Sequence, residues 1–423
     1  MTKKSGNRVL AETLKAYGSD HFFHVPMIVP PAVMDMTAIG VEPVVTHSEK
    51  AAAYMADGYA RVSGRVGVCG AQAIGAANLA SGLLDALMAR SPVLALSGGS
   101  TQETRERNFY QEVDHRAIYA GLTKFSARVE KAARLPDLLQ QAYRIATTGT
   151  PGPVHLELDG FWGSVLAEDF DDHFPLEPRY GACPAVRPKA LDEDVRKAAA
   201  SLRKAERPII VAGSGIRASG AQAALLAFAR SAQIPVATSL DAKAALPESE
   251  ALSVGVVGDY SRDTANMAVA DADFVLFVGT TTGSMVTRKW TVPRPGVAAV
   301  QIDIDPRELG RNYPLIVGLL GDPAAVLAQL AAALAGPVGK PAWLSRVAEL
   351  HRKWCDLAAE HESSNAVPMR PERLCRLLSE CLPDGALVAV DTGHAAGWAG
   401  RLSSMCGRIR LRWSRLPGDL AFS

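Results

Sequence analysis

Short, almost entirely apolar segments alternate with helix-like segments along most of this chain. Clear examples are residues 65–71 (RVGVCGA), 92–96 (PVLAL), 208–212 (PIIVA) and 273–279 (DFVLFVG). A strand with one face in solvent would alternate polar and apolar residues, whereas these segments are apolar on both faces. Because helical segments separate them, the pattern predicts an α/β fold in which parallel sheets are covered by helices on both sides.

The length of 423 residues is enough for two or three domains of ordinary size. We predict a first α/β domain over residues 1–170 and a second over 189–336. The segment 161–187 is rich in Pro, Asp and aromatic residues, which is typical of a linker. A third domain is predicted to begin over 365–423. Its strand–helix start cannot bury a core of its own, so we expect the rest of that domain to be missing from this chain.

Composition and charge restrict the classes of partner. The net charge of +1 gives no basis for binding nucleic acid or an anionic membrane surface. The first residues carry charges and then an amphipathic pattern rather than an apolar signal sequence, so we expect no membrane span and a cytoplasmic location. The six cysteines have neither CxxC nor metal-ligand spacing. We expect most of them to be buried thiols in a reducing compartment.

Residues 46–61 (THSEKAAAYMADGYAR) predict a helix that can pack very closely against a neighbour, because its inner positions are small. Its first turn carries one carboxylate, Glu49. The spacing Thr46-x-x-Glu49 fits a capping box, in which both side chains satisfy backbone N–H groups at the helix start. The alternative is that Glu49 is a catalytic acid, which requires a partner from elsewhere in the chain.

Two glycine-containing turns follow predicted strands. Residues 213–218 (GSGIRA) fit a variant of the dinucleotide-binding turn, where helix N-terminal amides hold a diphosphate. No acidic residue ends the next strand at the expected distance, so a tight strand-to-helix turn is favoured. Residues 75–78 (GAAN) would let a flat or charged ligand approach the backbone, or would serve turn geometry alone. His47 and His394 lie at strand ends, as proton carriers or as ordinary surface residues.

Several motifs occur in a fixed order along the chain. They are residues 23–26 (FHVP), 48–61 (SEKAAAYMADGYAR), 75–79 (GAANL), 110–114 (YQEVD), Lys124, 302–306 (IDIDP), 321–322 (GD) and 391–394 (DTGH). Together they resemble the thiamine-diphosphate-dependent superfamily that contains acetolactate synthase, pyruvate oxidase and benzoylformate decarboxylase. The sequence departs from the family pattern at Met27, at Ser48 and at residues 72–74, where glycine, histidine and S-G-P are usual.

The resemblance implies both a fold and a site. It implies a parallel-sheet domain that binds the aminopyrimidine ring, a Rossmann-like central domain, and a third α/β domain that binds the diphosphate through Mg²⁺. It also implies that the Glu49 carboxyl hydrogen-bonds the ring nitrogen N1′ and activates the cofactor for attack on a 2-oxo acid. The residues that fall on cofactor-binding positions are Pro26, Gly75, Asn78, Gln111, Gly393 and His394.

The implied function is a thiamine-diphosphate-dependent C–C bond lyase or ligase that acts on 2-oxo acids. An acetolactate synthase-like enzyme would belong to branched-chain amino acid biosynthesis. One alternative is a 2-oxo acid decarboxylase or carboligase of the same superfamily. Another is an inactive, truncated chain that serves only as a dimerisation or regulatory module. Because Glu49 would serve a cofactor held mainly by a second subunit, the resemblance implies a homodimer or homotetramer.

Two further cofactors follow from the resemblance. The family's G-D-G metal motif does not occur in this sequence, so we expect the Mg²⁺ ligands to be absent from this chain. We therefore predict weak thiamine diphosphate binding and little activity by the chain alone. Acetolactate synthases hold FAD in the central domain, and FAD is a candidate here. Residues 279–284 (GTTTGS) depart from the acidic G-A-R-F-D-D run of those enzymes.

Overall fold

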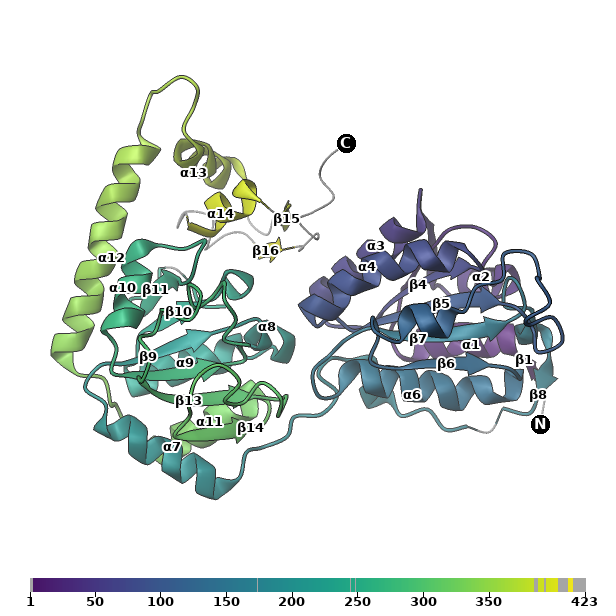
Figure 1. Cartoon of the computed structure of the whole chain (residues 1–423), viewed down its shortest axis with the longest axis horizontal. Helices are drawn as coiled ribbons and strands as arrows, with labels where there is room; N and C mark the ends of the chain where they lie inside the picture. The colour runs from purple at the N-terminus through teal and green to yellow at the C-terminus, as the bar shows by residue number, and fades with distance from the viewer. Residues whose placement is uncertain are drawn as a thin grey trace. The chain divides into compact units, whose positions relative to one another are not determined.

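The computed structural model describes residues 3–172, 174–243, 245–247, 249–383, 387–391, 393–401 and 410–413. The chain forms two compact units, Met1–Val186 and Arg187–Ser423 (Figure 1). Each unit contains a parallel sheet of six strands with helices packed against it. The predicted α/β class is therefore confirmed.

The first unit has the strand order β3-β2-β4-β5-β7-β6, and every neighbouring pair is parallel. The strands are β2 (His21–His24), β3 (Glu42–Val45), β4 (Gly67–Gln72), β5 (Val93–Gly99), β6 (Ser126–Val129) and β7 (Val154–Asp159). The helices are α1 (Gly6–Ala16), α2 (Pro30–Ala38), α3 (Glu49–Ser63), α4 (Gly75–Ala89), α5 (His115–Tyr119) and α6 (Leu135–Thr147). A short antiparallel pair joins β1 (Lys4–Ser5) to β8 (Asp169–Phe170).

The two faces of this sheet are covered by different helices. Phe22 lies in a core with α1, α2 and α6, whereas the next residue, Phe23, lies in a core with α3, α4 and α5. Successive side chains of a strand point to opposite faces, which explains this division. The contact between α3 and α4 is very close, because a Cβ on Gly82 would lie 2.6 Å from the Ala53 side chain. The predicted packing of the small-residue helix is therefore confirmed.

The second unit has the strand order β11-β10-β9-β12-β13-β14, again with parallel neighbours. The strands are β9 (Pro208–Ala212), β10 (Val236–Thr238), β11 (Ser253–Val256), β12 (Phe274–Val278), β13 (Ala298–Asp303) and β14 (Val317–Leu320). The helices α7 (Asp192–Lys204), α8 (Gly215–Ser219), α9 (Gln222–Ala232) and α11 (Pro323–Leu334) contribute to one core, and α10 (Asp263–Asp271) contributes to the other.

The C-terminal part of this unit contains α12 (Pro341–Glu362), α13 (Pro371–Cys381), β15 (Leu387–Val390), α14 (His394–Arg401) and β16 (Arg410–Trp413). The beginning of α12 packs on the central sheet, where the Trp343 indole N–H donates to the Pro208 carbonyl at 2.8 Å. The strands β15 and β16 form a parallel pair. The boundaries of a third domain stay a prediction.

Several short elements were not predicted. They include the strands β6, β11 and β14, which have four residues each. The segment expected to be an irregular linker contains β8, which pairs with the N-terminal strand β1. The helix expected after residue 215 is divided into α8 and α9, because Gly220 adopts φ +63 and ends α8 in the left-handed region.

The cysteines differ from expectation. Cys69 and Cys375 are buried, but Cys183 is only partly buried, and Cys355 and Cys381 are exposed. The expectation that most are buried is therefore wrong for the described residues. In the same part of the chain, no group of three or more His, Cys, Asp or Glu side chains is arranged to hold a metal ion. None of the described helices combines the length and apolar character needed to cross a bilayer.

Candidate active site

Ser48, not Thr46, caps the helix that carries Glu49. The Ser48 side chain accepts a hydrogen bond from the Ala51 N–H at 3.2 Å, and its backbone is extended. The Thr46 hydroxyl instead donates to the Ser48 carbonyl at 2.9 Å. The predicted Thr46–Glu49 capping box is wrong, because Glu49 is the first residue of α3 and the box needs a carboxyl at the third.

The Glu49 carboxyl faces the start of α4. The Asn78 side-chain amide donates to Glu49 Oε2 at 3.3 Å. A Cβ added to Gly75 would lie only 2.7 Å from Glu49 Oε1, so the absence of a side chain allows this approach. Glu49 is half-buried and Asn78 is exposed. The structure thus brings together three of the residues predicted from the sequence, by packing the first turns of α3 and α4 against each other.

Pro26 and Gln111 lie on loops that follow β2 and β5, two strands of the same sheet that β4 separates. Pro26 follows β2 and is exposed, and Gln111 lies in the loop between β5 and α5 with φ +58. The amide nitrogen of Gln111 donates to the Tyr110 hydroxyl at 3.1 Å, while its Oε1 atom is buried without a hydrogen-bond partner among the described residues. Within that part of the chain, neither residue hydrogen-bonds Glu49. Both follow the carboxyl ends of parallel strands, where α/β proteins bind ligands.

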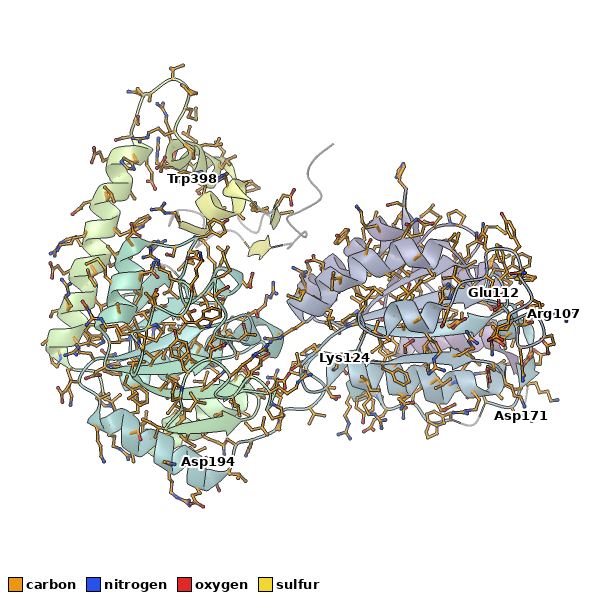
Figure 2. The ribbon with its side chains drawn as sticks, in the orientation of Figure 1. Arg107, Glu112, Lys124, Asp171, Asp194 and Trp398 are labelled. Carbon is orange, nitrogen blue, oxygen red and sulfur yellow. The ribbon has the colours of Figure 1, made fainter. Side chains whose placement is uncertain are left out.

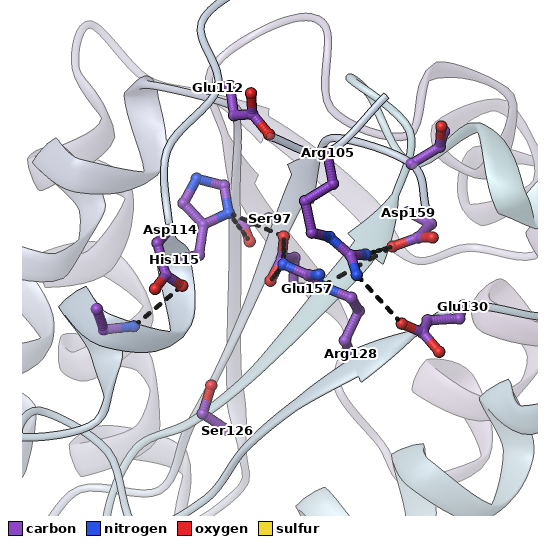
Figure 3. Close-up of polar contacts among 12 residues, drawn as sticks. Ser97, Arg105, Glu112, Asp114, His115, Ser126, Arg128, Glu130, Glu157 and Asp159 are labelled. Carbon is purple, nitrogen blue, oxygen red and sulfur yellow. Dashed lines mark hydrogen bonds and ion pairs between the residues drawn. The ribbon is translucent and has the colours of Figure 1, made fainter. Parts of the chain in front are cut away.

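Glu112 organises the loop that carries Gln111 (Figures 2 and 3). Its carboxylate accepts from the backbone N–H of Glu106 at 2.7 Å and of Phe109 at 3.3 Å. The hydrogen bond from Glu106 is the largest cause that lowers the pKa of this carboxyl. A folded loop of this kind holds Gln111 in a defined position.

Lys124 (Figure 2) lies at a position that matches a family motif, and its contacts in the structure stabilise the fold. Its ammonium group donates to the carbonyls of Ile145 and Thr148, the latter at 2.9 Å. These carbonyls lie at the carboxyl end of α6, where a positive charge stabilises the helix.

Gly393 and His394 belong to the second unit. Gly393 is an exposed turn residue with φ +87, and His394 is the exposed first residue of α14. His47 is also exposed, in the turn before α3. Their roles stay predictions.

A chain of hydrogen bonds among buried and part-buried side chains ends at the Ala73 carbonyl, two residues before Gly75, and sequence reasoning missed it. Figure 3 shows its link between Ser97 and His115. His155 bonds Ser126 at 2.9 Å and Ser97 at 2.8 Å, and Ser97 bonds His115 at 3.0 Å. His115 then reaches the Ala73 carbonyl at 2.8 Å. A signal was present in residues 153–158 (PVHLEL), since a polar residue inside an apolar strand predicts a buried polar partner.

A group of buried charges adjoins this chain (Figure 3). The Glu157 carboxylate is fully buried and accepts two hydrogen bonds from the Arg128 guanidinium, at 2.7 and 2.8 Å. Asp159, at the end of the same strand, lies 3.5 Å from Arg105 and 3.9 Å from Arg128. Burial is the largest cause that raises the pKa of Asp159, and the two arginines oppose it.

The glycines of residues 213–218 are explained by chain packing. A Cβ on Gly213 would lie 2.3 Å from the Gly279 carbonyl oxygen, and one on Gly215 would lie 2.7 Å from the Gly279 Cα. The close contact between these two loops is therefore enough to require glycine, and no bound ligand is needed to explain it. This agrees with the favoured interpretation, a tight strand-to-helix turn.

The N-terminal and central parts of the chain match one known family. Residues 4–118 match the description "Thiamine pyrophosphate enzyme, N-terminal TPP binding domain". Residues 195–330 match "Thiamine pyrophosphate enzyme, central domain". The first match contains Glu49, Gly75, Asn78 and the loop with Gln111, and the second contains the six central strands. The chain therefore belongs to the thiamine pyrophosphate enzyme family.

The chain is also similar to curated proteins. A probable acetolactate synthase large subunit of Methanocaldococcus jannaschii is 33% identical over 84% of this chain and 61% of its own length. An acetolactate synthase large subunit of Lactococcus lactis is 28% identical over 93% of this chain and 68% of its own length. A putative thiamine pyrophosphate-containing protein of Bacillus subtilis is 28% identical over 95% and 68%. The matches therefore cover about three-fifths to two-thirds of these relatives.

Proposed function

We propose that this chain works in a thiamine-diphosphate-dependent enzyme that makes or breaks C–C bonds of 2-oxo acids, of the acetolactate synthase kind. The observation that supports it best is the Glu49 carboxyl, held by Asn78 against the bare backbone of Gly75. The names of the relatives support the acetolactate synthase kind over other members of the family.

The residues present fit an aminopyrimidine ring. The ring needs a carboxyl partner at one nitrogen and flat, side-chain-free backbone close by. Glu49 supplies the carboxyl. Gly75 supplies backbone without a side chain, and even a methyl group there would collide with the Glu49 carboxyl. The buried Oε1 of Gln111, which lacks a partner among the described residues, is an acceptor for a ligand N–H group. We propose that Glu49, Asn78, Gly75, Gln111 and Pro26 bind this ring.

Four of these residues have separate tasks in the proposal. Glu49 holds a proton at the ring nitrogen N1′, and Asn78 fixes the orientation of the carboxyl through the 3.3 Å hydrogen bond. Gly75 permits the close approach, and Gln111 orients the ring edge. When bound, thiamine diphosphate supplies the nucleophilic carbon and the electron sink that cleavage of a 2-oxo acid needs. Gly393 and His394 are proposed to contact the cofactor from the third domain.

The partners and further cofactors are part of the same proposal. We infer a homodimer or homotetramer, in which the exposed outer faces of α3 and α4 meet a second copy. Met55 is 42% exposed, Leu84 39% and Met88 61%, an amount of apolar surface that favours association. Light scattering of the purified protein measures the oligomeric state. Mg²⁺ would hold the diphosphate of the cofactor. FAD in the central domain would give a yellow protein with a flavin absorption spectrum.

A Glu49→Gln substitution tests the proposal. Pyruvate turnover of the assembled enzyme is measured with thiamine diphosphate and Mg²⁺, and the products are analysed. We expect Glu49→Gln to lower kcat by about 100-fold or more, as loss of a proton-transfer group does. The matched control is Glu42→Gln, an exposed glutamate at the start of β3.

The outcomes separate the alternatives. Acetolactate as the product supports the synthase, whereas an aldehyde or another ligation product indicates a decarboxylase or carboligase of the same family. An unchanged rate in Glu49→Gln would refute the catalytic role of Glu49. A complete absence of turnover in the intact, assembled protein would favour a dimerisation or regulatory module.

A further inference from the structure

Donors and acceptors can be assigned in only one consistent way along the hydrogen bonds that lead from Ser126 to the Ala73 carbonyl. The Ala73 carbonyl can only accept, so His115 Nε2 must carry a proton and donate to it at 2.8 Å. In neutral His115 the Nδ1 atom then accepts, and the Ser97 hydroxyl must donate to it at 3.0 Å. Ser97 has a single proton, so its oxygen accepts from His155 Nε2 at 2.8 Å. His155 Nδ1 accepts in turn from Ser126 at 2.9 Å.

One main-chain carbonyl thus fixes the tautomer of two histidines. Burial lowers the pKa of His115 and lowers the pKa of His155 well below its usual value, which favours the neutral forms that this arrangement needs. The charged groups that face them are Glu157 from β7 and Arg128 from β6, together with Asp114 at the start of α5. Glu157 and Asp114 favour protonation of His115, and Arg128 opposes it.

The short helix α5 makes a second contact with the same turn. The Tyr119 hydroxyl donates to the Ala76 carbonyl at 2.7 Å, and the Tyr119 side chain is fully buried. Its ring stacks on His155, with centroids 3.8 Å apart and planes within 6°. Two donors of α5, His115 and Tyr119, therefore bind the carbonyls on either side of Gly75.

The Gly75 turn needs such support, because its backbone is strained. Ala73 has φ +32, in a region that residues with a Cβ rarely adopt and that costs about 1–3 kcal/mol. Its N–H donates to the Gly98 carbonyl at 2.9 Å, and its carbonyl accepts both from His115 at 2.8 Å and from the Ala76 N–H at 3.1 Å. Without the His115 bond, only the Ala76 N–H holds this carbonyl, so the strained peptide can relax by a small rotation that shifts Gly75.

Movement of Gly75 would reach Glu49 directly. The Glu49 carboxyl touches Gly75 and accepts from Asn78 one turn further along α4. On the other side, Asp114 caps α5 by accepting from the Ala117 N–H at 3.3 Å, and the Gln111 loop ends at this cap. The helix α5 therefore connects the loop that carries Gln111 to the Gly75 turn, and both carry predicted site residues.

We propose that His115 and Tyr119 are positioning residues, which hold the Gly75 turn at the distance that Glu49 needs to act on its cofactor. The proposal rests on the proposed function for its effect on catalysis, but the geometry that it asserts can be measured on the chain without turnover. In this proposal both residues act through the backbone of the Gly75 turn, so they are positioning residues rather than catalytic ones.

Nuclear magnetic resonance of protein labelled with ¹⁵N-histidine tests the tautomers. The sequence has nine histidines, and spectra of His115→Gln and His155→Gln assign the two signals. We expect both rings to be neutral at pH 7 and to carry the proton on Nε2 alone. A proton on Nδ1 of either neutral ring would overturn the proposed direction of the hydrogen bonds.

A second measurement tests the positioning. In His115→Leu and Tyr119→Phe we expect the Gly75 amide and Asn78 side-chain resonances to shift, whereas His115→Gln, which keeps a side-chain N–H donor, restores them. The matched control is Thr123→Val, which removes a 2.8 Å hydrogen bond to the Tyr119 carbonyl at the end of α5. Unshifted Gly75 and Asn78 signals in a folded His115→Leu protein would refute the positioning role.

Turnover then links positioning to catalysis. We expect His115→Leu to lower kcat for pyruvate by about 10- to 100-fold with KM changed by less than about twofold, and His115→Gln to recover most of it. If Glu49→Gln leaves kcat unchanged, the proposed function fails, while the resonance shifts still decide the geometry. If Glu49→Gln is inactive but His115→Leu is fully active, the positioning role fails and the proposed function stands.

Discussion

Gly75→Ala should separate stability from function at the Glu49 site. The added methyl group would begin 2.7 Å from Glu49 Oε1 and 3.2 Å from both its Cδ and its Cγ. An ordinary contact of 3.4 Å therefore requires the carboxyl oxygen to move by about 0.7 Å. Because the group that must move is the end of a flexible side chain, the surrounding backbone can stay in place.

The expected effects on stability nearly cancel. Displacing Glu49 from its preferred rotamer costs about 0.5–1.5 kcal/mol. Alanine is better than glycine in a helix by up to about 1 kcal/mol, which applies to the first turn of α4. We therefore expect the free energy of unfolding to change by less than about 1 kcal/mol. A shift of the carboxyl by most of an ångström should nevertheless lower kcat by about 10- to 100-fold.

The assay compares Gly75→Ala with Gly58→Ala, a glycine inside α3 where a Cβ would meet nothing within 4 Å. Urea unfolding gives the stability of both variants, and pyruvate turnover of the assembled protein gives kcat. Gly58→Ala is a control for stability alone, because Gly58 lies one turn from Met55 on the helix proposed to meet a second copy, and it should gain about 0.5–1 kcal/mol. Full activity in a folded Gly75→Ala protein would refute the reasoning, as would a loss of several kcal/mol in its stability.

Three further predictions concern stability. Asp57→Ala should lower the free energy of unfolding by about 1.5–3 kcal/mol in urea, because it removes a buried carboxylate that bonds the Arg61 guanidinium at 2.8 Å, while Asp85 at 3.4 Å still compensates the Arg61 charge. His155→Gln should weaken the loss of stability below about pH 6.5, measured by unfolding at several pH values. Burial lowers the pKa of His155, so the unfolded chain binds the proton more readily and acid favours unfolding. Gly213→Ala should cost about 1–3 kcal/mol or more in urea, because its Cβ meets the rigid Gly279 backbone.

Matched controls distinguish these effects from general sensitivity to mutation. Asp137→Ala breaks an exposed ion pair with Arg134 at 2.8 Å and should cost at most about 1 kcal/mol. Gly283→Ala places a Cβ no closer than 3.4 Å to a side-chain oxygen and should be tolerated. Equal losses in Asp57→Ala and Asp137→Ala would contradict the role of burial. A pH dependence unchanged by His155→Gln would show that other groups cause it.

Much of the fold was predictable because its signals are local. The apolar segments around β4, β5, β9 and β12 identified parallel strands, and the small residues of α3 indicated close packing. The strands β6 and β14 were not predicted. Their place in a sheet depends on hydrogen bonds to neighbours that are distant in the chain.

The candidate site was predictable only in part. Ordered motifs selected Glu49, Gly75 and Asn78, and the structure places all three in contact. The predicted helix cap was wrong. Thr46 and Ser48 both have hydroxyl groups, and only the path of the chain after β3 decides which hydroxyl accepts from the N–H groups at the helix start.

The sequence by itself determined the class of fold, the family and the carboxylate at the start of α3. Only the tertiary structure decided what surrounds that carboxylate. The hydrogen bonds from His115 and Tyr119 to the Gly75 turn join residues more than 40 positions apart. Hydrophobic periodicity describes which way a residue faces within its own element, and it contains no information on which distant side chain meets it there. Packing of α4 against α3 and α5 supplies that information.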